Sequence, residues 1–262
     1  MICVRVQERR QDIVRHLDEH NSIRVSDLSS LYEVTEETIR RDLENLESEG
    51  YLKRTHGGAF KVAFSSEEIE FRVRYMRNRL EKQQIGRKAA ELVLRKDAIV
   101  LDASTTALQL ANQLKDRKDI AVITHAVKVI MALAGNNDIT VIATGGMLEP
   151  RTLSFIGPLV ENALSTYNIQ KAFISCKGLT PESGITESTD TQAKVKSEII
   201  KSAKEVILLA DHDKFGVAAL ATVAPATAIH KLITDNGTPE EELNKFRRLG
   251  VEVIVSGELD LA

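Results

Sequence analysis

The sequence predicts an α/β protein in two parts: a small helical part that ends in a β-hairpin, and a larger part built on a mostly parallel sheet. Three observations predict this fold class. Apolar residues recur at helical spacing in the first 50 residues, and a glycine pair separates two short strand-like runs at 51–62. From residue 82 onward, short apolar runs alternate with amphipathic stretches, which is typical of a parallel sheet covered by helices.

The N-terminal part is predicted to contain three helices and a hairpin. Apolar residues on one face place the helices at about 7–20, 25–32 and 36–48. Gly50 is expected to end the third helix, and Gly57-Gly58 lies at the expected turn of the hairpin.

The C-terminal part is predicted to contain seven strands, several of them nearly all apolar, as strands buried on both faces are. These strands lie at 98–102, 120–124, 139–143, 171–175, 206–210, 231–235 and 251–255. The helices between them lie near 105–115, 126–134, 158–166, 190–203 and 239–249. The run Ser65-Ser66-Glu67-Glu68 interrupts both patterns, so we expect domains at 1–62 and 82–262 joined by a linker at 63–81.

Composition excludes several classes of protein. The chain has 262 residues, of which 43% are hydrophobic and 28% charged, and this balance predicts a folded globular protein. No apolar run reaches the roughly 18–20 residues of a membrane span, and residues 1–11 are too charged for a secretory signal. Cys3 and Cys176 give neither a disulfide framework nor a zinc-site spacing. We therefore expect a cytoplasmic protein with no membrane association and no cofactor or metal.

The charge is distributed unevenly around a net value of −3. Residues 71–96 hold 9 basic and 2 acidic residues, while 1–70 hold 10 and 15 and 97–262 hold 16 and 21. A basic block between acidic parts suggests a junction that meets an anion or the acidic domains themselves. A solvated helix face explains it equally well.

The third predicted helix has features of a DNA-reading helix. Thr35 is placed as its N-cap, and burial of the apolar face leaves Thr38, Arg40 and Arg41 near the open face. An arginine there can bind a guanine edge or a phosphate. The hairpin residues Lys53, Arg54 and His56 could lie along the backbone or minor groove as a wing. A three-helix protein-interaction module with solvated arginines remains open, because this part is acidic overall.

In the C-terminal part, the best candidate site is 102–106, which reads Asp-Ala-Ser-Thr-Thr between a strand and a helix. Backbone amides and hydroxyls at a helix N-terminus can bind an anion, although an ordinary N-cap has the same sequence. The chain has neither a P-loop nor a dinucleotide-binding glycine motif. Further polar clusters follow strands at 176–178, 210–216 and 234–235, where parallel sheets bind ligands.

The residues also resemble a known family. Residues 38–43 read Thr-Ile-Arg-Arg-Asp-Leu and 56–59 read His-Gly-Gly-Ala, a combination similar to that of the DeoR/GlpR family of bacterial transcription regulators. The resemblance implies a winged helix-turn-helix, with the two-helix unit at about 23–42, that binds a double-stranded DNA operator. The DNA-binding residues implied are Thr35, Thr38, Arg40, Arg41, Arg54 and His56. Thr35 stands where the family more usually has Ser.

The resemblance continues through most of the C-terminal part, including 81–86, 102–106, 145–146, 171–179, 184–186, 210–216 and 233–235. It implies the fold of ribose-5-phosphate isomerase and CoA transferases, a phosphorylated sugar or polyol as effector, and a homodimer or homotetramer. It implies that Ser104, Thr105 and Thr106 hold the phosphate and that Lys177 and Lys214 add positive charge, with Asp102 and Asp211 completing the set. Asp102 would repel a phosphate, so we expect it to bind a sugar hydroxyl or orient the loop. Asp213 replaces the usual Ser or Thr beside Lys214.

The expected function is a repressor of a carbohydrate-metabolism operon that its effector releases from DNA. One alternative is an active sugar-phosphate isomerase, which needs a carboxylate base. The predicted strand at 171–175 carries none, although Glu187 and Asp190 lie nearby. A metal sensor is another alternative, because His16 and His20 lie one helical turn apart. We expect neither catalytic residues nor a metal site.

Overall fold

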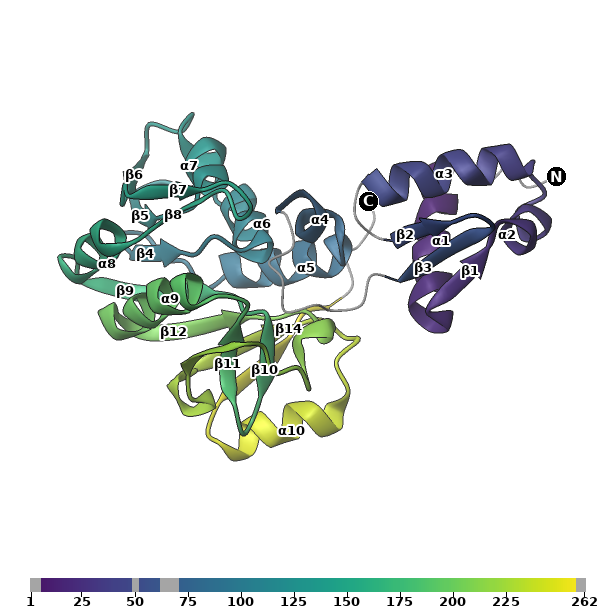
Figure 1. The fold of residues 1–262 in the computed structure, drawn as a ribbon. Helices are drawn as coiled ribbons and strands as arrows, with labels where there is room; N and C mark the ends of the chain where they lie inside the picture. The colour runs from purple at the N-terminus through teal and green to yellow at the C-terminus, as the bar shows by residue number, and fades with distance from the viewer. Residues whose placement is uncertain (1–5, 49–51, 62–70, 258–262) are drawn as a thin grey trace. The chain divides into compact units, whose positions relative to one another are not determined.

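The computed structural model describes residues 6–48, 52–61 and 71–257 (Figure 1). The chain divides into two compact units, Met1–Ser65 with Arg72–Arg77, and Ser66–Phe71 with Asn78–Ala262. We call them the N-terminal unit and the sensor unit. Gly50, Cys3 and the 65–68 run lie outside the described residues. Part of the expected linker is helical, in α4 (Phe71–Met76) and the start of α5 (Arg79–Ala90), so much of the basic 71–96 block is helical.

The N-terminal unit is a winged helix-turn-helix. Its elements are α1 (Val6–His20), β1 (Ser22–Arg24), α2 (Val25–Leu31), α3 (Glu36–Ser48), β2 (Leu52–Thr55) and β3 (Gly58–Lys61). The apolar faces of the three helices meet in one core that includes Ile13, Leu17, Ile39 and Leu43. The three predicted helices and the hairpin are confirmed.

A third strand, β1, was not predicted, because three residues are too few to show a periodicity. It pairs antiparallel with β3, which lies between β1 and β2. A Cβ at Gly58 would lie 2.0 Å from the carbonyl oxygen of Ile23. Gly58 is therefore required by the close approach of β1.

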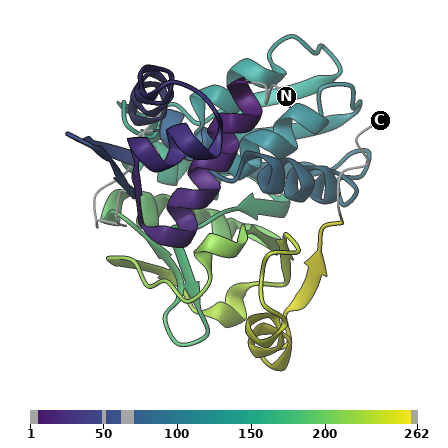
Figure 2. The same cartoon turned by 90° about the vertical axis from the view of Figure 1, so that its right-hand side faces the viewer.

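The sensor unit is built on a seven-stranded sheet in the order β15-β14-β12-β9-β4-β5-β6, and every neighbouring pair is parallel. All seven predicted strands are confirmed. The strand bounds are β4 Ala98–Leu101, β5 Ile120–Thr124, β6 Ile139–Ala143, β9 Ile169–Ile174, β12 Ala203–Leu209, β14 Lys231–Thr234 and β15 Glu252–Val255. β15, the yellow strand in Figure 2, forms one edge.

The strand order reverses between β4 and β9. The chain runs from β4 outward through β5 to β6, returns to β9 on the other side of β4, and continues outward to β15. In parallel α/β sheets, ligands bind beyond the carboxyl ends of the strands at such a switch point. The topology therefore predicts a ligand site at the loops that follow β4 and β9.

Helices cover the sheet (Figure 1). α5 packs closely on α6 (Thr105–Gln113), and α6 packs on α7 (Val127–Leu133), while α8 (Pro158–Ser165) packs on α9 (Asp190–Ser202). A Cβ at Gly86 would lie 2.8 Å from the backbone of Gln109, so the approach of α5 to α6 requires a glycine. The last helix is α10 (Glu240–Arg248).

Two small antiparallel sheets were not predicted, because their strands are three or four residues long. They are the hairpin of β7 (Met147–Glu149) and β8 (Ser154–Ile156), and the sheet of β10 (Gly178–Thr180), β11 (Gly184–Glu187) and β13 (Ala221–Ala224). In the part of the chain that the structure describes, no helix combines the length and apolar character that crossing a membrane requires.

Candidate DNA-binding and effector sites

The N-terminus of α3 is capped as predicted. Thr35 Oγ1 accepts a hydrogen bond from the backbone N–H of Thr38 at 3.3 Å, and the Thr35 carbonyl accepts one from Ile39. One turn on, Arg40 forms an exposed ion pair with Glu36 at 2.6 Å. Arg41 is also exposed, and none of its interactions within the described residues engages its guanidinium group. Arg41 is therefore the freer of the two arginines to meet DNA.

Asp42 fixes the orientation of α3. Its carboxylate accepts hydrogen bonds from Arg9 Nε at 2.7 Å and Arg10 Nε at 2.8 Å, both on α1. The Asp42 side chain is 3% exposed and that of Arg9 is 8% exposed. This role was not predicted from the sequence, although Asp42 lies on the inner face of α3 with Ile39, Leu43 and Leu46. Because Asp42 points inward, Arg40 and Arg41 project outward.

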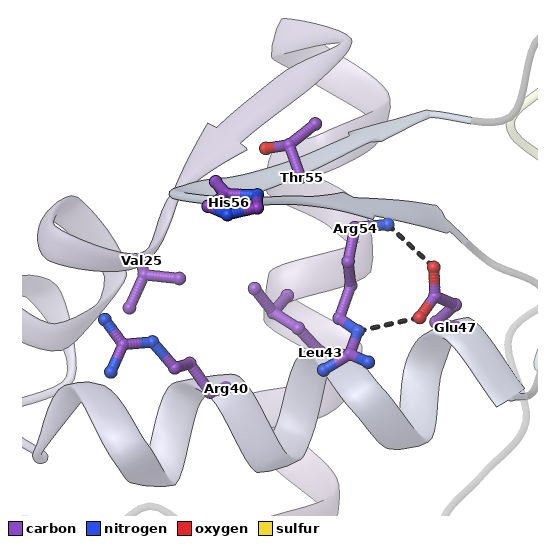
Figure 3. Close-up of a pocket in the computed structure, with 8 residues that line it drawn as sticks. Val25, Arg40, Leu43, Glu47, Arg54, Thr55 and His56 are labelled. Carbon is purple, nitrogen blue, oxygen red and sulfur yellow. Dashed lines mark hydrogen bonds and ion pairs between the residues drawn. The ribbon is translucent and has the colours of Figure 1, made fainter.

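A cavity of about 420 Å³ lies between α3 and the hairpin. Arg40, Leu43 and Glu47 line it from α3, and the hairpin contributes Arg54 and His56 (Figure 3). Glu47 accepts hydrogen bonds from the Arg54 backbone N–H at 2.9 Å and from Arg54 Nε at 2.7 Å. These two hydrogen bonds hold the pKa of Glu47 below its usual value. The ion pair orients the Arg54 side chain toward α3, so DNA contact by Arg54 stays a prediction.

Asp102 joins the loops that follow β4 and β9. Its two carboxylate oxygens accept hydrogen bonds from the backbone N–H groups of Ser104 at 3.0 Å and Ser175 at 2.8 Å. The side chain is fully buried. Of the two roles expected for Asp102, this geometry supports orientation of the loop.

Lys196, on α9, carries the charge that balances Asp102. Its ammonium lies 3.0 Å from Asp102 Oδ2, pairs with Glu187, and donates to the Ser175 carbonyl at 2.6 Å. Burial alone would lower the pKa of Lys196, but the Asp102 and Glu187 carboxylates outweigh it and raise that pKa. Burial likewise favours neutral Asp102, and the Lys196 charge reverses this and lowers the Asp102 pKa. We call Asp102, Glu187 and Lys196 the buried ion cluster.

The predicted phosphate-binding hydroxyls are enclosed. Ser104 Oγ caps α6 by accepting from the Ala107 N–H at 2.9 Å. Ser104, Thr105 and Thr106 are 7%, 4% and 1% exposed. A ligand that binds these groups must therefore displace part of what covers them.

The loop after β12 carries a second polar cluster. Asn78 Nδ2 donates to Asp211 Oδ1 at 3.1 Å and to Asp213 Oδ2 at 2.8 Å. Buried Lys82 lies 3.9 Å from Asp211. Burial would raise the pKa of Asp211, but the charges of Lys214 and Lys82 lower it. Asp213, which stands where the family usually has Ser or Thr, therefore accepts a hydrogen bond from Asn78.

Lys214 is half-buried, and within the described residues it has no ion pair. Its charge lowers the pKa of Asp211 and opposes the effect of burial on Cys176, whose pKa burial raises to about 12. Lys214 therefore lies near the carboxyl ends of β9 and β12. Lys177 follows β9 directly. The roles of these residues toward a ligand stay predictions.

Over the described ranges, no group of three or more metal-ligating side chains was found. His20 Nδ1 forms a hydrogen bond with the His16 carbonyl at 3.0 Å, so the two histidines are linked through the helix backbone.

A winged helix-turn-helix on the same chain as a parallel α/β unit defines a transcriptional regulator with a separate sensor. The chain matches the DeoR-like helix-turn-helix domain over residues 9–63 and the DeoR C terminal sensor domain over residues 77–236. It belongs to the DeoR family of transcriptional regulators.

The chain is similar along nearly its whole length to regulators of Bacillus subtilis (strain 168). It is 44% identical to the uncharacterized HTH-type transcriptional regulator YulB, over 88% of this chain and 90% of that protein. It is 34% identical to the HTH-type transcriptional repressor GlcR, over 95% and 96%. Among solved structures, ribose 5-phosphate isomerase A from Methanocaldococcus jannaschii aligns with 53% of this chain and 55% of its own at a TM-score of 0.40 and 17% identity.

Proposed function

We propose that this regulator represses a carbohydrate-metabolism operon in the cytoplasm and leaves its operator when a phosphorylated sugar or polyol binds the sensor unit. It acts as a homodimer or homotetramer, which places recognition helices on half-sites about one DNA turn, or a multiple of it, apart. The observation that carries the DNA-binding part is the outward projection of Arg40 and Arg41 from a helix held by buried Asp42.

Arg41→Ala is expected to weaken operator binding by about 1–3 kcal/mol, because the free guanidinium of Arg41 contacts a base edge. Fluorescence anisotropy, with DNA upstream of the protein's own gene and a scrambled duplex at fixed salt, measures this. Arg15→Ala is the control, since Arg15 is an exposed arginine on α1 that pairs only with Asp12 among the described residues. Unchanged discrimination between the two duplexes would reject base reading by Arg41.

The effector part of the proposal rests on the carboxyl edge of the sheet. The α6 N-terminus offers backbone N–H groups and a favourable dipole to a phosphate. Lys214 adds a cation, and Lys196 compensates the charge of Asp102, which precedes that helix start in the sequence. The switch point of the sheet lies between β4 and β9, at the loop that leads from β4 into α6.

Lys214→Met is expected to weaken sugar-phosphate binding about 10-fold or more, because it removes a charge-assisted hydrogen bond. Calorimetric titration with a panel of pentose, hexose and glycerol phosphates measures it, and release from operator DNA gives a second readout. Lys204→Met is the matched control, since Lys204 lies at the amino end of the same strand, β12. Equal affinities in wild type and Lys214→Met would remove Lys214 from the site.

The relatives are transcriptional regulators, which supports a non-enzymatic sensor. Glu187, considered as an isomerase base, pairs with Lys196, and Asp190 is exposed at the start of α9. Incubating the purified protein with pentose phosphates tests this point, and turnover above background would establish an isomerase instead.

A further inference from the structure

His125 is a fully buried histidine that follows β5, and neither of its ring nitrogens has a hydrogen-bond partner within the described residues. Its backbone carbonyl is paired, since it accepts a hydrogen bond from the Phe155 N–H at 2.8 Å. Buried polar side chains are nearly always paired. Two unpaired nitrogens on one enclosed ring therefore indicate a partner outside the described residues, such as a bound ligand or a water molecule.

The sheet register places His125 beside the candidate effector site. Thr124 pairs with Leu101, so the residues that follow them, His125 and Asp102, leave adjacent strands at the same edge. The charges of Asp102 and Lys196 both act on the imidazole. Burial, the largest cause, and Lys196 together lower the pKa of His125 to about 4. The imidazole is therefore neutral at neutral pH, with one donor and one acceptor nitrogen.

Ser188 is a second unpaired group, and it is the residue that follows Glu187 of the buried ion cluster. Its Oγ is buried and has no hydrogen-bond partner among the residues described. It follows Glu187, which pairs with Lys196, which in turn contacts Asp102. A hydroxyl and a neutral imidazole each donate and accept hydrogen bonds, as do the hydroxyls of a sugar or polyol.

We propose that His125 and Ser188 read the hydroxyl groups of the effector and so determine which sugar or polyol the sensor accepts. The proposal rests on the function proposed above, in which the phosphate binds at the start of α6 and at Lys214. Because a pocket built to bond a hydroxyl rejects an analogue that lacks it, these two residues set selectivity, while the cationic side chains set the affinity for any phosphate.

The experiment compares two probes on wild type and variants: the tightest-binding member of the sugar-phosphate panel, and inorganic phosphate. In His125→Leu, the affinity for the sugar phosphate is expected to fall about 10- to 100-fold. In Ser188→Ala, which deletes only one unpaired oxygen, it falls about 3- to 10-fold. Affinity for inorganic phosphate stays within about twofold in both variants. Thermal unfolding of the ligand-free variants reports whether each is folded.

His230→Ala is the control, because His230 precedes β14 at the opposite end of the strands and accepts a hydrogen bond from the Val206 N–H. Equal losses for both probes in Ser188→Ala, or no loss for either probe, would overturn the proposal and leave the phosphate site standing. No loss is the result if enclosed water alone satisfies the two groups. If wild type binds neither probe, the proposed function falls together with this inference.

Discussion

Lys196→Ala is expected to lower the free energy of unfolding of the sensor unit by about 3–5 kcal/mol. The substitution removes the cation that faces Asp102 and Glu187, and leaves two buried carboxyl groups without compensation. It also leaves the Ser175 carbonyl without its donor. Urea denaturation followed by far-ultraviolet circular dichroism measures the loss.

Lys194→Ala is the matched control on the exposed side of α9, and its effect should stay within about 0.5 kcal/mol. The difference in free energy of unfolding between wild type and Lys196→Ala should become smaller as the pH is lowered. In wild type the folded pKa of Asp102 lies below its unfolded value, so its ion pair stabilises the fold above the unfolded pKa and ceases to do so as pH falls through the folded pKa. If Lys196→Ala lost no more free energy of unfolding than Lys194→Ala, the buried ion cluster would not stabilise the fold.

Asp42→Ala is expected to destabilise the N-terminal unit by about 3–5 kcal/mol, because Arg9 then keeps a buried charge with no counterion. A unit this small has little stability to lose. Operator binding should therefore disappear, while sugar-phosphate binding by the sensor unit persists. Thermal unfolding and anisotropy with operator DNA measure the two effects.

Asp27→Ala is the control for Asp42, since Asp27 is exposed in the first turn of α2. Asp42→Asn retains the size of the side chain and separates loss of charge from loss of packing. Full operator affinity in Asp42→Ala at 37 °C would show that α3 keeps its orientation without the ion pair to α1.

The large elements of the fold could be predicted because each carries a pattern long enough to read. Strands such as Ala98–Leu101 and Ile120–Thr124 are apolar runs that are largely buried, and helix α3 repeats its apolar residues over three turns. β1 and β10 are three residues long and owe their conformation to the strands they pair with. No local pattern encodes such pairing.

The candidate sites could be predicted only in outline. Residues 102–106 are recognisable because they are contiguous, whereas Lys196 and His125 are brought to the same edge by the sheet register and by α9. In the sequence, Lys196 is one of 35 basic residues. Lys196 lies on the buried face of α9 with Val195 and Ile199. The helical spacing of these residues is the sequence pattern from which the burial of Lys196 could have been predicted.

Asn78 is the first residue of the sensor unit after the Arg72–Arg77 segment of the N-terminal unit. Its φ of +48° is one that side-chain-bearing residues rarely adopt, and its amide is bonded to both carboxylates of the 211–213 segment, next to Lys214. A ligand that moved this segment would change the hydrogen bonds of Asn78, a residue at a boundary between the two units. The proposed coupling between effector binding and operator binding would then pass through the polypeptide at residues 77–78.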